Sequence, residues 1–326
     1  MRLQYEAPIT TATLDAIIDR DGIYAKAASG TDNLRHEGTT INLRGGRSGI
    51  IGDMNVPYKN WVIKDVLINV QRGANSITKW GIRRHNLVDP RTERVRVVDF
   101  TRPNNANLMM EHAIYDEVAS GMAIYSLCSA ANIPAQFIQI RLAGNRQDPK
   151  WKNERTILIS DCTAEEIGQL RGAGRAAFAV SVKDSGPNAT VVIDNLQLQT
   201  IRQSNVAKRS DGTYADSFAA VCIEYCRSLQ WEGGFINYKN PRTDAVQLFD
   251  FANKAEGQTG PENIHISNVT FGPANHIALR LDKTTKSVSI SNCQGDGDIK
   301  IYKQGADNIY RISSRTPISQ GFSFST

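Results

Sequence analysis

Residues 262–271 read ENIHISNVTF, and residues 286–295 read KSVSISNCQG. In both segments, alternating aliphatic residues are followed by a polar residue, an asparagine and another apolar residue. The alternation predicts a strand with one buried face. The asparagine predicts a tight bend, because this residue tolerates the left-handed backbone conformation. The apolar residue after the bend indicates that the chain turns there and stays at the core.

The same pattern occurs upstream, often with aspartate in place of asparagine. Further copies begin at Trp61, Val95, Ile157 and Val191, and a degenerate copy at Leu229 has glycine at the bend. From residue 61 to residue 288, the spacings between copies are 34, 62, 34, 38, 35 and 24 residues, and the longest gap has room for one unmarked copy. Recurrence of this kind is typical of a solenoid, and its irregularity argues against helical-hairpin repeats. An ordinary parallel sheet or sandwich with coincidental turns is the alternative.

The pattern resembles the right-handed parallel β-helix of the pectate lyase-like superfamily, over roughly residues 39–314. The resemblance implies an all-β fold, a single-stranded β-solenoid whose bend residues form a ladder inside the stack. The matching positions are Asp65, Asp99, Asp161, Asn195, Asn268 and Asn292. The motif concerns the fold and says nothing specific about chemistry.

Three segments are expected along the chain. Residues 1–38 form an N-terminal capping segment with a short helix, because Leu14, Ile17 and Ile18 share one helical face and Thr13 is a suitable N-cap. Residues 39–316 form the parallel β-helix, and residues 317–326 form a C-terminal tail.

Composition limits the classes of partner. The chain has 38 Lys and Arg against 33 Asp and Glu, a net charge of +5 that suits an acidic polysaccharide. The sequence has no basic block of the kind that indicates nucleic-acid binding. It also has no apolar run long enough to indicate a membrane span. The N-terminus lacks a signal-peptide layout, which leaves a secreted or virion location and a cytoplasmic one both open. The spacing of the five cysteines predicts neither a zinc site nor a disulfide framework.

A second class of strand lies between copies of the pattern, and the resemblance assigns it to the sheet that lines the binding groove. Its outward side chains are expected to form a polar ladder with a rung of about 4.8 Å, close to the length of a sugar ring. These strands are expected at residues 82–85, 137–141, 180–183, 221–225, 246–250, 277–281 and 299–302.

Candidate site residues come from this ladder and from a loop at residues 203–217. An acidic glycan can be cleaved by β-elimination, which needs a base and a cation that stabilises the enolate. Hydrolysis would instead need two carboxyl groups about 5 Å or about 6.5–9.5 Å apart. The catalytic candidates are Lys183, Glu224, Arg141, Asp211 and Tyr214, and the substrate-binding candidates are Gln139, Arg209, Gln247, Arg280 and His85. No metal site or cofactor is expected, with calcium held by carboxylates of different coils as the alternative.

These observations predict a protein that acts on a polysaccharide, either a lyase or a glycoside hydrolase. The alternative is a non-catalytic carbohydrate-binding or structural module, such as a phage tail spike or a surface adhesin. A tail spike would be expected to form a homotrimer. Fold analogy does not decide between the two classes.

Overall fold

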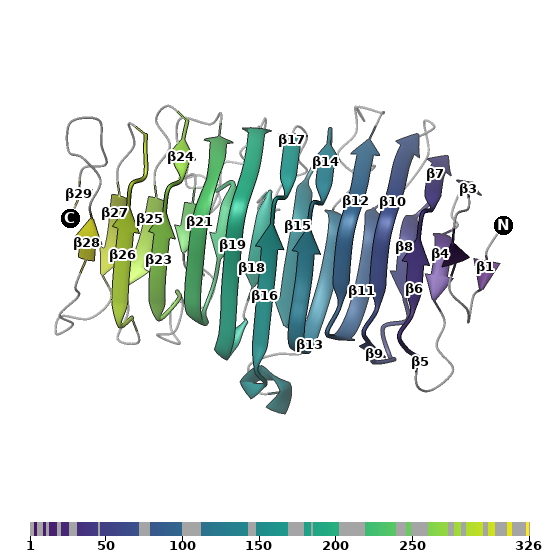
Figure 1. Ribbon diagram of the computed structural model, residues 1–326, viewed down its shortest axis with the longest axis horizontal. Coiled ribbons are helices and arrows are strands. Elements are labelled where there is room, and N and C mark those ends of the chain that lie inside the picture. The colour runs from purple at the N-terminus through teal and green to yellow at the C-terminus, as the bar shows by residue number, and fades with distance from the viewer. Residues whose placement is uncertain are drawn as a thin grey trace, which may run out of the picture.

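The computed structural model describes residues 3–4, 9–10, 13–17, 21–25, 31–44, 46–71, 79–99, 112–142, 148–168, 179–183, 185–201, 219–238, 246–248, 260–272, 277–281, 285–295, 299–303, 312–314 and 324–325. Apart from one 3-10 turn, η2 (Pro149–Lys152), the regular structure of these residues is strand, so the fold is all-β. The strands stand side by side along one long axis, with the chain termini at its two ends (Figure 1). No helix in the described part of the chain is long and apolar enough to cross a membrane.

Sheet A is a single ladder in which each strand pairs in parallel with the next one. Its order is β1 (Leu3–Gln4), β4 (Asp21–Ala25), β8 (Ser48–Gly52), β11 (Trp80–Val88), β13 (His112–Ser126), β15 (Gln136–Leu142), β18 (Val180–Lys183), β20 (Val221–Ile223), β22 (Val246–Leu248), β25 (Ile277–Leu281), β27 (Ile299–Lys303) and β29 (Phe324–Ser325). The short strands β5 (Thr31–Asp32) and β9 (Tyr58–Lys59) extend it beside β11. The strands that the sequence predicted for a groove-lining sheet all lie in this ladder.

Sheet B consists of two parallel ladders that share the long strands β10, β12, β19 and β21. The first runs β2 (Ile9–Thr10), β6 (Arg35–Glu37), β10 (Val62–Gln71), β12 (Arg91–Asp99), β13, β16 (Arg155–Ser160), β19 (Gly186–Ile201), β21 (Cys226–Tyr238), β23 (Asn263–Ser267), β26 (Ser287–Ser291) and β28 (Ile312–Ser314). The second runs β3 (Thr13–Ile17), β7 (Thr40–Arg44), β10, β12, β14 (Ser129–Ala131), β17 (Thr163–Ile167), β19, β21 and β24 (Thr270–Phe271).

Each strand of sheet B pairs with the strand one circuit later, a circuit being the stretch of chain between two directly paired positions. Tyr125 pairs with Ile159 and Ile159 with Ile193, so these two circuits are each 34 residues long. The unmarked copy predicted in the longest gap is β13, which pairs with β12 on one side and β16 on the other. The spacings predicted from residue 157 onward, 34, 38, 35 and 24 residues, are confirmed by the register. The first predicted spacing, 34 residues from position 61 to position 95, was wrong, because Val62 pairs with Arg91 and that circuit is 29 residues long.

The bends of sheet B are residues with a positive φ that stack on one another. Asp65, Asp161 and Asn195 adopt φ values of 55°, 51° and 48°. Asn268, Asn292 and the glycine at position 233 follow at equivalent positions, as the sequence predicted. The Asn195 Nδ2 donates a hydrogen bond to Asp161 Oδ1 at 2.8 Å, one circuit away.

Two expectations about this ladder of bends were wrong. Asp99 is not a bend residue: it lies buried at the end of β12, and the bend of that circuit is Arg94, with φ 49°. Arg94 donates two hydrogen bonds to Asp65. Because Lys64 pairs with Glu93 and Val66 pairs with Val95, Arg94 is the residue that lies beside Asp65 at the bend. The bend residues also lie on the surface rather than inside the stack. At each bend two consecutive side chains point outward, as Asp194 and Asn195 do between the buried Ile193 and Leu196.

The expected N-terminal helix is not present. Residues 13–17 form strand β3, in which Leu14 pairs with Ile41 of β7. The neighbouring strand supplies hydrogen-bonding partners along its whole edge, and this tertiary context overrides a helical pattern of one and a half turns. Strands of both sheets thus also occur within residues 1–38 and at the C-terminal end.

The space between the sheets is filled by stacked aliphatic side chains. Ile82, Ile114 and Ile138 of sheet A occupy one register position in consecutive circuits and are fully buried. Ile159 and Ile193 of sheet B stack in the same way on the opposite wall. Like side chains in register pack with little void, and their burial supplies the main driving force for the fold.

An ion pair lies within this core. Arg84 donates to both carboxylate oxygens of Asp116, at 3.0 and 2.6 Å, and both side chains are fully buried. Tyr125 donates its hydroxyl to the same carboxylate at 2.6 Å, and Thr92 accepts from Arg84 at 2.5 Å. Burial raises the pKa of the Tyr125 hydroxyl, and the adjacent Asp116 raises it further. The carboxylate is therefore hydrogen-bonded on both oxygens, as a buried charge requires.

Candidate functional site

The outer face of sheet A carries two rows of side chains that stack from circuit to circuit. The first row is Arg83, Tyr115, Gln139, Ser181, Cys222 and Gln247. The second row contains Glu117, Arg141 and Lys183 in register, with His85 and Glu224 at its two ends. Because the pairing is parallel and in register, equivalent side chains in each row recur every 4.8 Å or so.

An imidazole–carboxylate pair lies at the β11 end of these rows. The Nδ1 of His85 is 2.9 Å from Glu117 Oε2, and Arg83 Nε donates to His85 Nε2 at 3.0 Å. A nitrogen that accepts from a guanidinium carries no proton, so the His85 proton is on Nδ1 and faces Glu117. Tyr115 donates its hydroxyl to the other oxygen of Glu117 at 2.6 Å. This arrangement leaves Nε2 of His85 as the basic nitrogen of an oriented imidazole.

Cationic and aromatic groups surround that pair. The guanidinium of Arg83 lies 4.2 Å from the ring centroid of Trp80 and 6.0 Å from that of Tyr115. His112 packs against Tyr115 edge to face, with ring centroids 5.2 Å apart. Its Nε2 is 2.5 Å from Gln139 Oε1 and donates to it, since an amide oxygen only accepts. The site thus presents ring faces and positive charge together on two adjacent strands.

The shifts in pKa indicate the charge states of two residues of this site, Glu117 and Tyr115. Burial alone would raise the pKa of Glu117, but hydrogen bonds from His85 and Tyr115 outweigh it and lower the pKa. Burial raises the pKa of Tyr115 to about 12, and its hydrogen bond to Glu117 adds to the effect. Near neutral pH, Glu117 is an anion that orients His85, and Tyr115 keeps its proton.

The catalytic candidates from the sequence are distributed unevenly. Arg141 is exposed on β15, where its charge acts on Tyr115 and Glu117. Lys183 and Glu224 face each other with 3.9 Å between Nζ and Oε1. Asp211 and Tyr214 lie outside the described residues.

The substrate-binding candidates also differ in position. His85 belongs to the carboxylate pair rather than to an open surface, and its side chain is buried. Gln139 and Gln247 lie in the first row but are buried too. Arg280 is in β25, where the structure describes the backbone only, and Arg209 lies outside the described residues. Accessible members of the rows therefore cluster towards β11, β13 and β15.

Sequence reasoning missed Arg83, Tyr115 and Glu117 as site residues. The two β13 residues alternate with the buried Ile114 and Val118, which is the period of a half-buried strand. That alternation falls inside the gap of 62 residues, where the spacing left room for one unmarked copy of the pattern and no strand was predicted at residues 112–126.

The described side chains of these two rows can be compared with what each of the two cleavage chemistries requires. Glu117 and Glu224 are three rungs apart, roughly 14 Å, which exceeds the separation that glycoside hydrolysis needs. A basic nitrogen beside guanidinium groups meets the needs of β-elimination. Within the described residues no group of three or more His, Cys, Asp or Glu side chains is placed to hold a metal ion.

No protein-family model matches this chain, and no curated protein or solved structure matches it either.

Proposed function

We propose that the protein is a right-handed parallel β-helix of the pectate lyase-like kind that binds an acidic polysaccharide along the outer face of sheet A and cleaves it by β-elimination. The fold assignment is supported by in-register parallel pairing of strands one circuit apart on both sheets. The reaction is supported by one observation above all, the His85–Glu117 pair with Arg83 on its free nitrogen.

In this proposal Arg83 changes partner when substrate binds. Its guanidinium turns from His85 to the uronate carboxylate and neutralises the charge that develops in the enolate. Arg141, on the strand after Glu117, binds a carboxylate of the neighbouring sugar. The loss of the Arg83 hydrogen bond exposes Nε2 of His85 to the substrate.

The proton transfers then use groups already in place. Nε2 of His85 takes the proton from the carbon next to the carboxylate, and the electron pair forms a carbon–carbon double bond as the glycosidic C–O bond breaks. Tyr115, which stays protonated because its pKa is raised to about 12, donates a proton to the leaving oxygen. Glu117 positions His85 and stabilises the imidazolium.

The test is a panel of polygalacturonate, alginate and hyaluronan, followed by the ultraviolet absorbance of the unsaturated product. His85→Gln should lower the rate by about 10²–10⁴-fold with little change in binding. Glu224→Gln, on the same face but three rungs from Glu117, should retain most of the rate. His265→Gln on sheet B is the matched control and should behave as the wild type.

Two results would change the conclusion. Failure to bind any anionic glycan would reject the proposal. Binding without an unsaturated product, in both wild type and His85→Gln, would withdraw the reaction and favour the non-catalytic binding module.

A further inference from the structure

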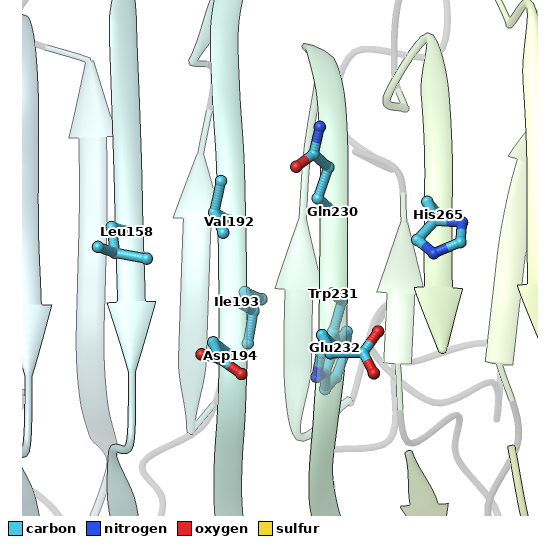
Figure 2. A pocket seen from close by; sticks show the side chains of 8 residues that line it. All are labelled: Leu158, Val192, Ile193, Asp194, Gln230, Trp231, Glu232 and His265. Carbon is cyan, nitrogen blue, oxygen red and sulfur yellow. The ribbon is translucent and has the colours of Figure 1, made fainter. Parts of the chain in front are cut away.

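The outer face of sheet B carries a cluster of apolar side chains on β13 and the bend that follows it. Met122 and Leu127 are 48% and 51% exposed, and they are two of the three large hydrophobic residues that are exposed in the described part of the chain. Ile124 lies between them and is half-exposed. Leu158 and Val192 continue the row of Ile124 on β16 and β19, and Figure 2 shows these two side by side on neighbouring strands.

Leu127 differs from the neighbouring bend residues because its side chain is apolar. Its φ of 54° is a conformation that leucine disfavours, and the bends of the next two circuits use Asp161 and Asn195, which tolerate it. Half of the Leu127 surface remains in water, so burial within its own chain does not offset the unfavourable conformation. Burial against another molecule would offset it.

Charges of opposite sign lie on the two sides of this cluster. On the N-terminal side, β12 carries three exposed arginines and one half-exposed glutamate, and the arginines are Arg91, Arg94 and Arg96. On the C-terminal side, β19 and the circuit of β16 and β17 carry three exposed carboxylates, Asp161, Glu165 and Asp194. A face with this distribution of charge is complementary to a second copy of itself that runs in the opposite direction.

We infer that the outer face of sheet B is the interface of a symmetric dimer, in which two copies of this chain run antiparallel about a two-fold axis along β13. The axis places β13 on the partner's β13, β12 on the partner's β16, and β10 on the partner's β19. Met122, Ile124 and Leu127 each lie near their own counterpart in the partner. Apolar groups therefore occupy the centre of the interface and charges its two sides.

The register of sheet B determines which charges meet across this axis. Lys64 and Asp194 lie at the same height on their strands, because direct pairing links their positions through β12, β13 and β16. They are two strands from β13 on opposite sides, so each Lys64 faces the partner's Asp194. Arg94 and Asp161, the bend residues one strand from β13 on either side, face each other in the same way. Each of these contacts occurs twice in the dimer.

The size and shape of the face suit such an interface. The five strands from β10 to β19, over the length of residues 122–131, cover roughly 800 Å² on each copy, which is the area that a stable interface buries. A hollow of about 460 Å³ lies beside the cluster and is lined in part by Leu158, Val192 and Asp194. In the dimer, Val62 and Arg91 of the other copy lie over this hollow.

The inference does not depend on the proposed lyase activity, because the interface uses the outer face of sheet B. The rows of sheet A remain accessible in both copies. A dimer without lyase activity and a monomer with it are distinct experimental results.

The first test is the mass of the full chain in solution. Sedimentation equilibrium at about 50 μM should give twice the 36.0 kDa of one chain. Leu127→Asn removes a central apolar contact but suits the positive φ, so it should raise the dissociation constant at least about tenfold without lowering the urea stability of the monomer. Met54→Gln is the control, since it changes the third exposed hydrophobic residue, which follows β8, and should leave the dissociation constant unchanged.

The second test is the direction of the two copies. Residues 64 and 194 are four strands apart within one chain, roughly 19 Å, so a zero-length carbodiimide cross-link between Lys64 and Asp194 forms only between copies. Mass spectrometry of mixed ¹⁴N and ¹⁵N protein should detect this cross-link, and Asp194→Asn should abolish it. A chain that is monomeric at this concentration, a trimer, or a dimer without the cross-link would overturn the inference.

Discussion

Stability should fall in mild acid because of one buried histidine. His36 is 1% exposed, and Trp61 Nε1 donates to its Nδ1 at 3.0 Å. Burial, and secondarily the charge of Arg84, lowers the pKa of His36 from 6.5 to about 4. Between these values the unfolded chain binds a proton that the folded chain does not, so the free energy of unfolding decreases as pH falls. A difference of about 2.5 pKa units corresponds to a loss of about 3 kcal/mol, complete near pH 4.

The substitution His36→Gln isolates this effect. The glutamine amide can still accept the indole hydrogen bond of Trp61 but does not titrate. Urea unfolding followed by tryptophan fluorescence, at steps from pH 7 to pH 4, should show a steep fall for the wild type and a shallow one for the variant. His265→Gln, which changes an exposed histidine, should keep the wild-type slope. Equal slopes for the wild type and His36→Gln would refute the reasoning.

Three further outcomes are expected. Asp116→Ala should destabilise the fold by about 3–5 kcal/mol in urea unfolding, because it leaves the buried Arg84 charge unpaired. Asp65→Asn removes the charge of an equally bidentate arginine contact at the surface, keeps a residue that tolerates the positive φ of this bend, and should have little effect; a similar loss in both variants would contradict this account. Gly81→Ala places a Cβ 2.5 Å from the Ala113 carbonyl oxygen, so its urea midpoint should fall by the equivalent of about 1–3 kcal/mol. All five thiols are buried, so a thiol reagent should label the protein only after urea is added, and labelling of the native protein would disprove their burial.

The bends were predictable where the residue itself favours them. Asp161 and Asn195 tolerate a positive φ, so local chemistry marks the position of each bend. Arg94 has no such preference, and its bend is imposed by register with the circuits on either side. Asp99 was chosen in its place because it ends an apolar run. A second ladder of bends, with Asn33 and Asn60 joined by a side-chain hydrogen bond of 3.0 Å, went unnoticed because no strand pattern preceded it.

The candidate site was only partly predictable for a related reason. Alternation gives the outward face of a strand, and it correctly placed His85, Arg141 and Lys183 on sheet A. Alternation does not tell which outward side chains are buried in the folded protein, and Glu224 is one that is buried. The inward orientation of Arg84 could not be foreseen either, since a charged residue is expected to face water unless its partner is known.

Parallel pairing in register makes this molecule divisible into whole circuits, and two consecutive circuits have the same length. The strands of one circuit bond only to the circuits before and after it, and the 34 residues from position 125 to position 159 are followed by another 34 to position 193. Duplication of one such unit would insert a layer without shifting any existing register, and would lengthen the protein by about 4.8 Å. The length of this protein along its long axis can therefore change in steps of one circuit, by evolution or by design, while the strands at both ends stay the same.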